Sequence, residues 1–134
     1  MSAGVDPELE RAIRDAYAAF AEGDVESLRS FWREDAIYVN PPYAMEAGTR
    51  EGRDAVVEIW NGLHSLFEYE AVEVQEITEG LAGVLVVVRY RGRGKASGAP
   101  VDVPMAHVIQ IRDGRVAQLA WYGTRAEAAA AAGL

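Results

Sequence analysis

Residues 101–122 read VDVPMAHVIQIRDGRVAQLAWY. Two β-prone runs enclose the triplet RDG at 112–114, a pattern typical of a β-hairpin. A two-residue turn would pair His107 with Ala120, whereas a turn of all three residues, with its glycine left-handed, would pair His107 with Leu119. The choice of turn decides which side chains face the interior, because a shift of one residue reverses the faces of a strand.

The hydrophobic pattern favours the three-residue turn. In that register one face is mostly apolar, and we expect it on the concave side of the sheet with Met105, His107, Ile109, Ile111, Ala117, Leu119 and Trp121. The other face is mixed and would carry Val108, Gln110, Val116, Gln118 and Tyr122. We therefore predict the three-residue turn, and a histidine on an otherwise apolar concave surface.

Before the hairpin, helical periodicity comes first and strand alternation second. Asp6-Pro7 predicts a helix start and Gly23 its end, and Asp24 predicts the cap of a short helix with inward-facing Leu28, Phe31 and Trp32. The other expected elements are a strand at 36–40, a loop at 41–52, a helix at 54–67, strands at 69–78 and 81–90, and a short helix or tail at 125–132. This order predicts the α+β class, with N-terminal helices packed on a strongly curved antiparallel sheet.

The overall composition is that of one ordinary globular domain, which we expect to span residues 1–134. The chain has no cysteine, which excludes disulfides and thiolate chemistry and agrees with a cytoplasmic location. The longest apolar run, Val84–Val88, is far shorter than a membrane span, and we expect no signal peptide. The net charge of −8 disfavours a nucleic-acid partner, and no membrane partner is expected either.

Four stretches occur in an order that is familiar from one fold: AEGD at 21–24, FWREDA at 31–36, GRDAV at 52–56 and AHVIQIRDGRV at 106–116. In these stretches the chain resembles the SnoaL-like polyketide cyclases and ketosteroid isomerases of the nuclear transport factor two superfamily, which has the cystatin-like cone fold. The resemblance covers almost the whole chain. It implies a conical pocket between helices and sheet, and a homodimer through the outer face of the sheet. It does not name a reaction, because this fold hosts several chemistries as well as plain binding proteins.

The resemblance also places the catalytic positions of the family on this chain. The isomerases use a carboxylate base at the end of the first strand, and that position falls on Asn40. An amide cannot act as a base at neutral pH. The family's oxyanion-binding tyrosine falls on Ala16, with Tyr17 beside it, and its protonated aspartate falls on His107. We therefore expect no ketosteroid isomerase activity of the usual form.

His107 is the candidate catalytic residue, as a neutral general base or hydrogen-bond donor in the cavity. The alternative is a core histidine whose nitrogens are satisfied by a tyrosine or asparagine. The candidate ligand-binding residues are Tyr17, Trp32, Tyr38, Asn40, Trp60 and Trp121, for which core packing is the alternative. His64 is expected at the surface. With two distant histidines and no cysteine we expect no metal site, and we expect no cofactor.

Three functions fit these residues. The first is an enzyme that performs acid–base chemistry on a small apolar carbonyl compound. The second is a non-catalytic homodimer that binds a small apolar organic ligand in the same cone pocket. The third is a structural dimer whose cone is filled by its own side chains. The mixed hairpin face is the predicted dimer surface, and the loop at 41–52 is predicted to be a mobile lid at the cavity mouth.

Overall fold

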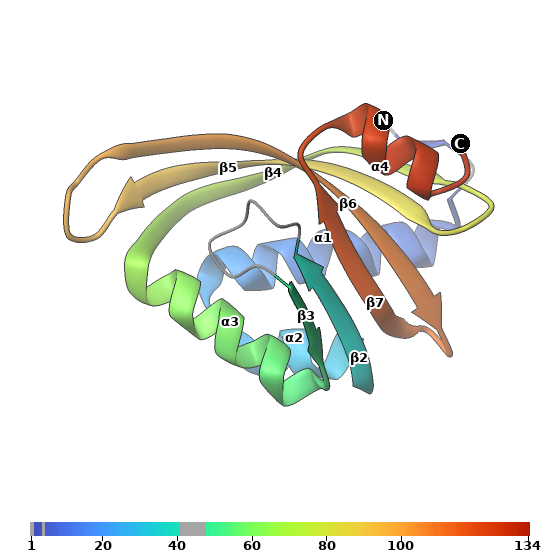
Figure 1. Cartoon of the computed structure of the whole chain (residues 1–134), viewed down its shortest axis with the longest axis horizontal. Coiled ribbons are helices and arrows are strands. Elements are labelled where there is room, and N and C mark those ends of the chain that lie inside the picture. Colours follow the sequence, from blue (N-terminus) through green and yellow to red (C-terminus); the bar gives the residue numbers. More distant parts are fainter. Residues whose placement is uncertain (1, 4, 41–47) are drawn as a thin grey trace.

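The computed structural model describes residues 2–3, 5–40 and 48–134. Four helices and seven strands follow one another along this described part of the chain (Figure 1). They are β1 (Ser2–Ala3), α1 (Pro7–Glu22), α2 (Val25–Phe31), β2 (Trp32–Asn40), β3 (Gly48–Glu51), α3 (Arg53–Leu66), β4 (Phe67–Glu79), β5 (Val84–Gly94), β6 (Pro100–Arg112), β7 (Arg115–Tyr122) and α4 (Arg125–Ala131).

The strands join one sheet in the order β1-β4-β5-β6-β7-β2-β3. Strands β4 to β7 form an antiparallel meander, as expected. The sheet as a whole is mixed, because β2 runs parallel to β7 and β1 runs parallel to β4. The predicted α+β class is confirmed. The parallel pairs arise because the segments before α3 enter the sheet beside strands that are distant in sequence.

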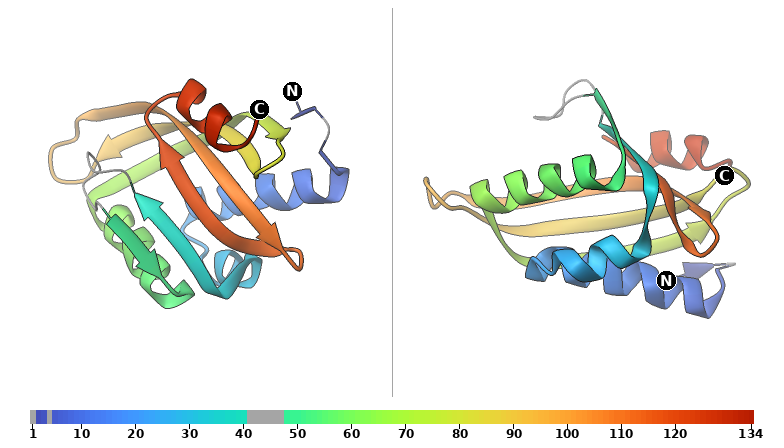
Figure 2. Two further views of the ribbon diagram at one scale, coloured as in Figure 1. Left: turned by 45° about the vertical axis from the view of Figure 1, so that its right-hand side comes forward. Right: turned by 90° about the horizontal axis from the view of Figure 1, so that it is seen from below.

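Helices cover both sides of the curved sheet (Figure 1, Figure 2). Helices α1, α2 and α3 lie on the concave side, where the main core contains the fully buried Ile13, Val56, Val86 and Val88. Helix α4 lies on the convex side, where Ala128 and Ala132 pack in a smaller core. The concave layer therefore holds the interior of the cone, and α4 closes part of its outer wall.

Helix caps set the N-terminal elements, as the sequence predicts. The Asp6 side chain accepts a hydrogen bond from the N–H of Glu8, Pro7 takes the first helical position, and Gly23 ends α1 with a left-handed φ of 74°. Asp24 caps α2, but the helix ends at Phe31. Trp32, predicted inside that helix, instead begins β2; its side chain is buried, as predicted.

The β6–β7 hairpin corrects the predicted turn. Asp113 and Gly114 have φ values of 54° and 75°, so the turn has two residues in the left-handed region, as in a type I′ turn. A β-bulge between Gln110 and Ile111 then shifts the register, and His107 lies opposite Trp121. The predicted pairing with Leu119 is therefore wrong, as is the alternative with Ala120. Because the bulge adds one residue to β7, Leu119 and Trp121 lie on the same face as His107, as the three-residue turn had predicted. This face is the concave one.

The same bulge and helix α4 change the predicted outer face. Val116 lies on the concave side, where it lines the cavity and is only 1 % exposed. Val108 is on the outer side, as predicted, but it is buried in the smaller core beneath α4. Gln110, Gln118 and Tyr122 remain as the accessible part of the mixed hairpin face.

Helix α4 is held at both ends. At its start, Arg125 donates two hydrogen bonds of 2.7 Å to the carboxylate of Glu76 on β4. At its end, the N–H of Ala82 donates to the carbonyl oxygen of Ala132. A Cβ on Gly80 would lie 2.0 Å from that same oxygen, so a glycine is required for this close approach.

The segment predicted as a loop at 41–52 contains a strand. Residues 48–51 form β3, which pairs antiparallel with the end of β2. Residues 41–47 lie outside the described residues, and the predicted lid falls mostly on them. Within the described part of the chain, no helix is long and apolar enough to cross a membrane.

Candidate ligand-binding pocket

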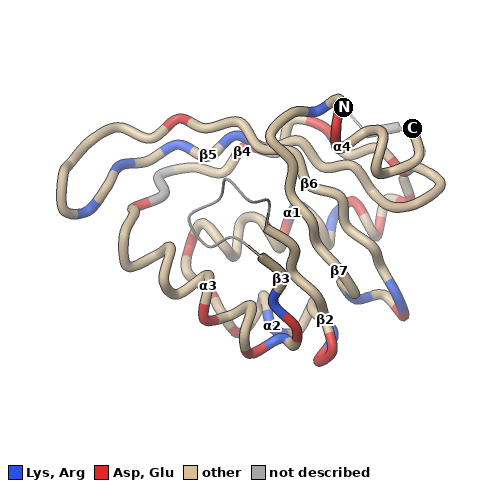
Figure 3. The backbone as a smooth tube through the Cα atoms, in the orientation of Figure 1, with Lys and Arg blue, Asp and Glu red and all other residues tan. Residues whose placement is uncertain are grey.

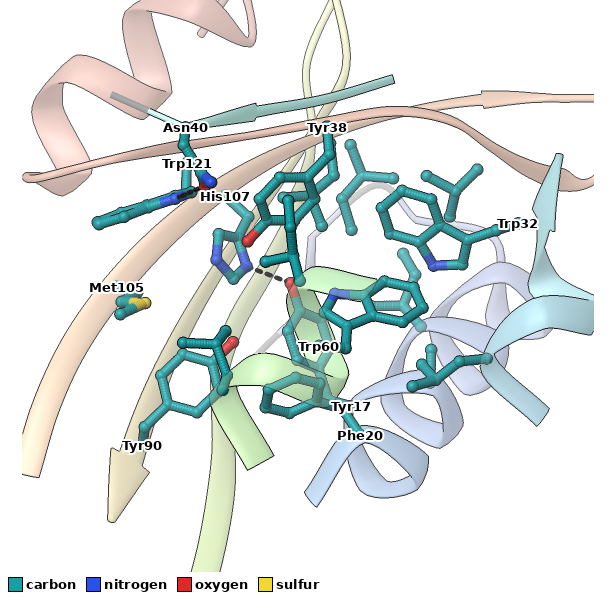
Figure 4. A pocket seen from close by; sticks show the side chains of 18 of the residues that line it. Tyr17, Phe20, Trp32, Tyr38, Asn40, Trp60, Tyr90, Met105, His107 and Trp121 are labelled. Atoms are coloured by element: carbon teal, nitrogen blue, oxygen red, sulfur yellow. Dashed lines mark hydrogen bonds between the residues drawn. The ribbon is translucent and has the colours of Figure 1, made fainter. Parts of the chain in front are cut away.

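A cavity of about 230 Å³ lies between the concave face of the sheet and the helices α1, α2 and α3. Nine of the 22 described residues that line it are Phe, Tyr or Trp: Tyr17, Phe20, Phe31, Trp32, Tyr38, Trp60, Phe67, Tyr90 and Trp121 (Figure 4). No Asp, Glu, Lys or Arg occurs among the described residues that line it. Charged residues lie instead along the helices, along β4 and β5, and at turns such as the β6–β7 tip (Figure 3). The cone is therefore hollow, and its described walls carry no charge.

The cavity volume limits what it can hold. An apolar cavity of about 150 Å³ is enough to bind benzene, whereas pockets for drug-sized ligands measure roughly 300–1,000 Å³. The present cavity lies between these sizes. It suits a molecule of one or two rings.

The central polar contact joins α1 to β6. Tyr17 follows Ile13 by one helical turn on the buried side of α1, and His107 lies on the concave side of β6. The Tyr17 hydroxyl and Nδ1 of His107 share a hydrogen bond of 2.5 Å, and the two rings are nearly parallel (Figure 4). Both side chains are buried, with 7 % and 3 % exposure. Two residues 90 positions apart are thus joined inside the pocket.

Burial keeps both groups neutral. Loss of solvation lowers the pKa of His107 to about 3, so its imidazole carries no charge at pH 7. Loss of solvation, and secondly the proximity of Tyr38, raise the pKa of Tyr17 well above its ordinary value, so it remains a phenol. A neutral imidazole has one N–H and one lone pair. The hydrogen bond therefore exists in two forms, in which either Tyr17 or Nδ1 donates.

The second ring nitrogen of His107 faces the cavity and has no hydrogen-bond partner among the described residues. Nδ1 is taken by Tyr17, and no described residue makes a hydrogen bond to Nε2. Protein atoms do not fully enclose Nε2, so the cavity reaches this nitrogen. One ring nitrogen is thus fixed, and the other can contact a ligand.

A second polar contact in the wall joins Asn40 and Trp121. The indole N–H of Trp121 on β7 donates a hydrogen bond to Oδ1 of Asn40, the last residue of β2 (Figure 4). Asn40 is only 6 % exposed. Its side-chain carbonyl therefore holds the indole of Trp121 in the cavity wall.

Another part of the wall consists of aromatic rings in contact with one another. Trp32 and Trp60 meet edge to face with ring centres 4.9 Å apart, and the ring of Tyr38 is tilted against that of Trp32 at 6.3 Å. This arrangement joins α3 to β2 through aromatic contacts. All three tryptophans of the chain line the cavity.

Sequence comparison places this geometry in a family. The family profile described as the SnoaL-like domain matches residues 13–119, which include most of the pocket wall. The chain belongs to the SnoaL-like domain family. No protein of established annotation matches the sequence significantly.

Several crystal structures share the fold of this SnoaL-like domain at low sequence identity. A nuclear transport factor two-like protein from Burkholderia pseudomallei is 19% identical, with a TM-score of 0.75 over 93% of this chain and 97% of that one. A protein with a ketosteroid isomerase-like fold from Catenulispora acidiphila, in complex with trimethylamine, is 21% identical, with a TM-score of 0.73 over 97% and 95%. TerC, co-crystallised with polyporic acid, is 20% identical, with a TM-score of 0.74 over 89% and 93%. At these identities the likeness shows the fold alone.

The structure brings together all the site residues that the sequence singled out. Tyr17, Trp32, Tyr38, Asn40, Trp60, His107 and Trp121 all line the cavity of the SnoaL-like domain. Ala16, at the position of the family's oxyanion-binding tyrosine, also lines it. Helix α1 thus presents both Ala16 and Tyr17 to the same cavity. The Tyr17 hydroxyl contacts His107.

Two placements differ from the sequence analysis. Tyr90 lines the cavity, with its ring centre 6.5 Å from that of His107, and was not among the predicted residues. Its signal was the alternation along β5, in which Val86, Val88 and Tyr90 share one buried face. His64 is half-buried rather than exposed, because its ring packs against Phe20 at 4.9 Å.

The described part of the cavity wall holds no carboxylate that could serve as the usual isomerase base. Asn40 occupies that position and bonds to Trp121, and no carboxylate occurs among the described lining residues. Nor do three or more His, Asp or Glu side chains of the described residues gather into a possible metal site. Any acid–base chemistry in this part of the pocket therefore falls to histidine and tyrosine.

Proposed function

We propose that this SnoaL-like domain binds a small, neutral, mostly apolar carbonyl compound of one or two rings, and that His107 acts on its carbonyl system as an acid–base group. The observation that carries the proposal is the Tyr17–His107 hydrogen bond in an uncharged aromatic cavity. Tyr17 fixes the ring, and Nε2 of His107 points at the ligand. Tyr17 is a positioning residue in this role.

The absence of charge on the described walls favours a neutral ligand. A buried carboxylate or ammonium group would lose its hydration without gaining an opposite charge, which is strongly unfavourable. The related proteins with trimethylamine and with polyporic acid carry unlike molecules. The proposal for the ligand of this chain therefore rests on its own lining, in which the Tyr17–His107 and Asn40–Trp121 pairs stand among aromatic and aliphatic side chains.

The alternative is a homodimer that binds the same compound without changing it. Both the enzyme and the binding homodimer should bind the compound, and only the enzyme should convert it. For the dimer, the surface we propose is the part of the mixed hairpin face that α4 leaves accessible, namely Gln110, Gln118 and Tyr122. Gln118→Arg should convert such a dimer to a monomer, because a two-fold axis brings the new charge close to its own copy. Sedimentation of both proteins at tens of micromolar tests this, and a monomeric wild type would reject the dimer.

Ligand binding can be followed by intrinsic fluorescence, since all three tryptophans line the cavity. The probe is isophorone, a one-ring conjugated ketone, and the matched control is 1,1,3-trimethylcyclohexane, which has the same carbon skeleton without the carbonyl. Wild type should bind isophorone with an affinity about 3- to 10-fold higher than the affinity expected from the hydrocarbon control. This difference is the usual contribution of one hydrogen bond. Trimethylamine serves as the charged control and should bind poorly.

The variant His107→Leu should remove this preference. It leaves an apolar cavity, so the hydrocarbon should still bind and shows that the pocket is intact. Equal preference for the ketone in wild type and variant would refute the role of His107. Failure of both compounds to change the fluorescence of the wild type would refute the binding proposal itself.

A further inference from the structure

We infer that the ligand is a ketone whose carbonyl group stands between a ring and an unbranched hydrocarbon chain, and that this chain lies on the first residues of β6, where the cavity opens. The inference rests on the proposed function, because it requires a carbonyl compound at His107. It goes further in assigning the chain a site of its own and in naming the residues that form this site.

The cavity opens toward the end of the molecule at which the β5–β6 hairpin projects (Figure 1). Exposure of the lining residues increases in that direction along β6: His107 is 3 % exposed, Met105 is half-buried and Val103 is 38 % exposed. Val103 is the one exposed side chain among the described lining residues. Toward the other end, Trp32 and Trp60 are buried. The mouth therefore lies beside Val103.

Three apolar side chains lead from the mouth to His107, and we call them the apolar strip. They are Val101, Val103 and Met105. They share the concave face of β6 with His107, because side chains at every second position of a strand point to the same face. The strip is one strand wide, since β7 pairs only with residues 106–112 of β6. On its other side lies β5, whose Tyr90 pairs with Val103.

The end of α3 forms a second wall opposite the apolar strip. Leu63 in the last turn of α3 and Phe67, the first residue of β4, line the same cavity. The N–H of Lys95 in the β5–β6 turn donates a hydrogen bond of 2.9 Å to the carbonyl oxygen of Leu66, which ties the end of α3 to the hairpin. The strip and the end of α3 therefore enclose a passage from the mouth to His107.

The two sides of His107 differ in their chemistry. In Figure 4, Met105 and Tyr90 lie on one side of His107, and Trp32 and Trp60 lie on the other. The tryptophan side suits a flat ring, because aromatic rings pack well against one another. The apolar strip has no aromatic residue, and its methionine adapts its shape to a flexible neighbour. A carbonyl group at His107 thus has a ring on one side and a chain on the other.

The dimensions of the apolar strip select an unbranched chain. Met105 and Val101 are separated by about 13 Å, at about 3.3 Å per residue of a strand. A site of this length and one strand wide fits a linear chain better than a second ring. Its three side chains carry no polar group, so a hydrocarbon chain leaves water there without covering a donor, an acceptor or a charge.

The test compares three phenyl ketones by isothermal titration calorimetry. They are acetophenone, valerophenone with its unbranched butyl chain, and pivalophenone, the isomer of valerophenone with a tert-butyl group. Valerophenone should bind to wild type at least about 10-fold more tightly than acetophenone, because each buried methylene group contributes up to about 4-fold in affinity. Pivalophenone should lack most of this gain, because its methyl groups cannot extend along the apolar strip.

Variants of Val103 test whether the strip is the source of the gain. Val103→Asp should remove most of the gain of valerophenone over acetophenone, because the chain would then take a carboxylate out of water. Val103→Thr keeps the branched shape of the side chain, so it guards against a folding defect, and it should reduce the gain in the same direction. Leu81→Asp is the matched control. Leu81 is 99 % exposed and does not line the cavity, so this variant should keep the gain of the wild type.

The outcomes separate this inference from the proposed function. If acetophenone binds but valerophenone gains nothing, or if the two isomers bind equally well, the chain site is refuted and the binding proposal stands. A gain that persists in both Val103 variants, or that is also lost in Leu81→Asp, would overturn the chain site as well. If none of the three ketones binds to the wild type, both proposals fail.

Discussion

His107 should make the stability of the protein depend on pH in a region where carboxylates contribute little. In the unfolded chain a histidine binds a proton near pH 6.5. In the folded protein, burial lowers the pKa of His107 to about 3. Between these values the unfolded state binds the additional proton, so the free energy of unfolding decreases as the pH falls. The contribution is fully present above pH 6.5 and is lost progressively below it.

The size of the effect follows from the difference in pKa. One pKa unit corresponds to about 1.4 kcal/mol, so His107 should cost about 2 kcal/mol of stability between pH 7 and pH 5. The side chain is only 3 % exposed, so solvent screening does little to reduce this value. A loss of this size is a large fraction of the stability of an ordinary domain.

The comparison that isolates His107 is wild type against His107→Gln. Urea unfolding at 25 °C, followed by tryptophan fluorescence, gives the free energy of unfolding of each protein at pH 5, 6, 7 and 8. Other groups with lowered pKa values, such as Glu76 and Asp35, occur in both proteins and cancel in the difference. The difference between the two proteins should therefore change by about 2 kcal/mol from pH 7 to pH 5.

Two results would refute the reasoning. If the curves of wild type and His107→Gln remain parallel from pH 8 to pH 5, His107 titrates as an exposed histidine. If wild type becomes more stable relative to the variant as the pH falls, the imidazole has an anionic partner in the folded state. Equal slopes of the denaturant dependence in both proteins are the necessary control, because they show that unfolding exposes the same surface.

Three further predictions concern the cavity and α4. Ala16→Leu adds an apolar side chain to the cavity wall and should weaken isophorone binding by about 10-fold or more. The stability should stay the same or rise, because the added side chain fills the cavity without introducing a polar group. An unchanged affinity in the fluorescence titration would contradict the assigned pocket. Gly80→Ala should lower the free energy of urea unfolding by about 1–3 kcal/mol, because its Cβ would overlap the carbonyl oxygen of Ala132; a neutral effect would mean that α4 docks loosely. Arg125→Ala should lower it by no more than about 1 kcal/mol, since the guanidinium is half exposed. That difference should vanish as acid protonates Glu76, whose pKa Arg125 lowers, and a difference that persists would reject the ion pair as its cause.

The concave face of β6 could be predicted because its signal is local and repeated. Along this strand Met105, His107, Ile109 and Ile111 recur at every second position, which puts His107 on one face with apolar residues. Helix caps were predictable for the same reason, since Asp6, Gly23 and Asp24 act within a few residues of their positions. The family resemblance supplied the cone, which local patterns alone do not reveal.

The hydrogen bonds across the cone could not be derived in the same way. The bond between Tyr17 and His107 depends on how α1 lies on the sheet, and the sequence narrows the partner of the histidine only to a tyrosine or an asparagine. The β3 strand escaped prediction because its sequence, GTRE, is short, polar and largely exposed, so its pairing with β2 has no hydrophobic pattern. The alanine-rich α4 gave no sign of the outer surface that it covers.

The bulge in β7 separates the number of residues in the strand from its pairing. Ala117 is the additional residue on β7, since its neighbours Val116 and Gln118 pair with adjacent residues of β6. Deleting Ala117 would remove the bulge and leave a regular ladder, in which Gln118 still lies opposite Gln110 and Trp121 still lies opposite His107. The pocket wall beside His107 would therefore survive the loss of one residue from β7, because the cross-strand pairs and not the length of the strand set which side chains enter the cavity.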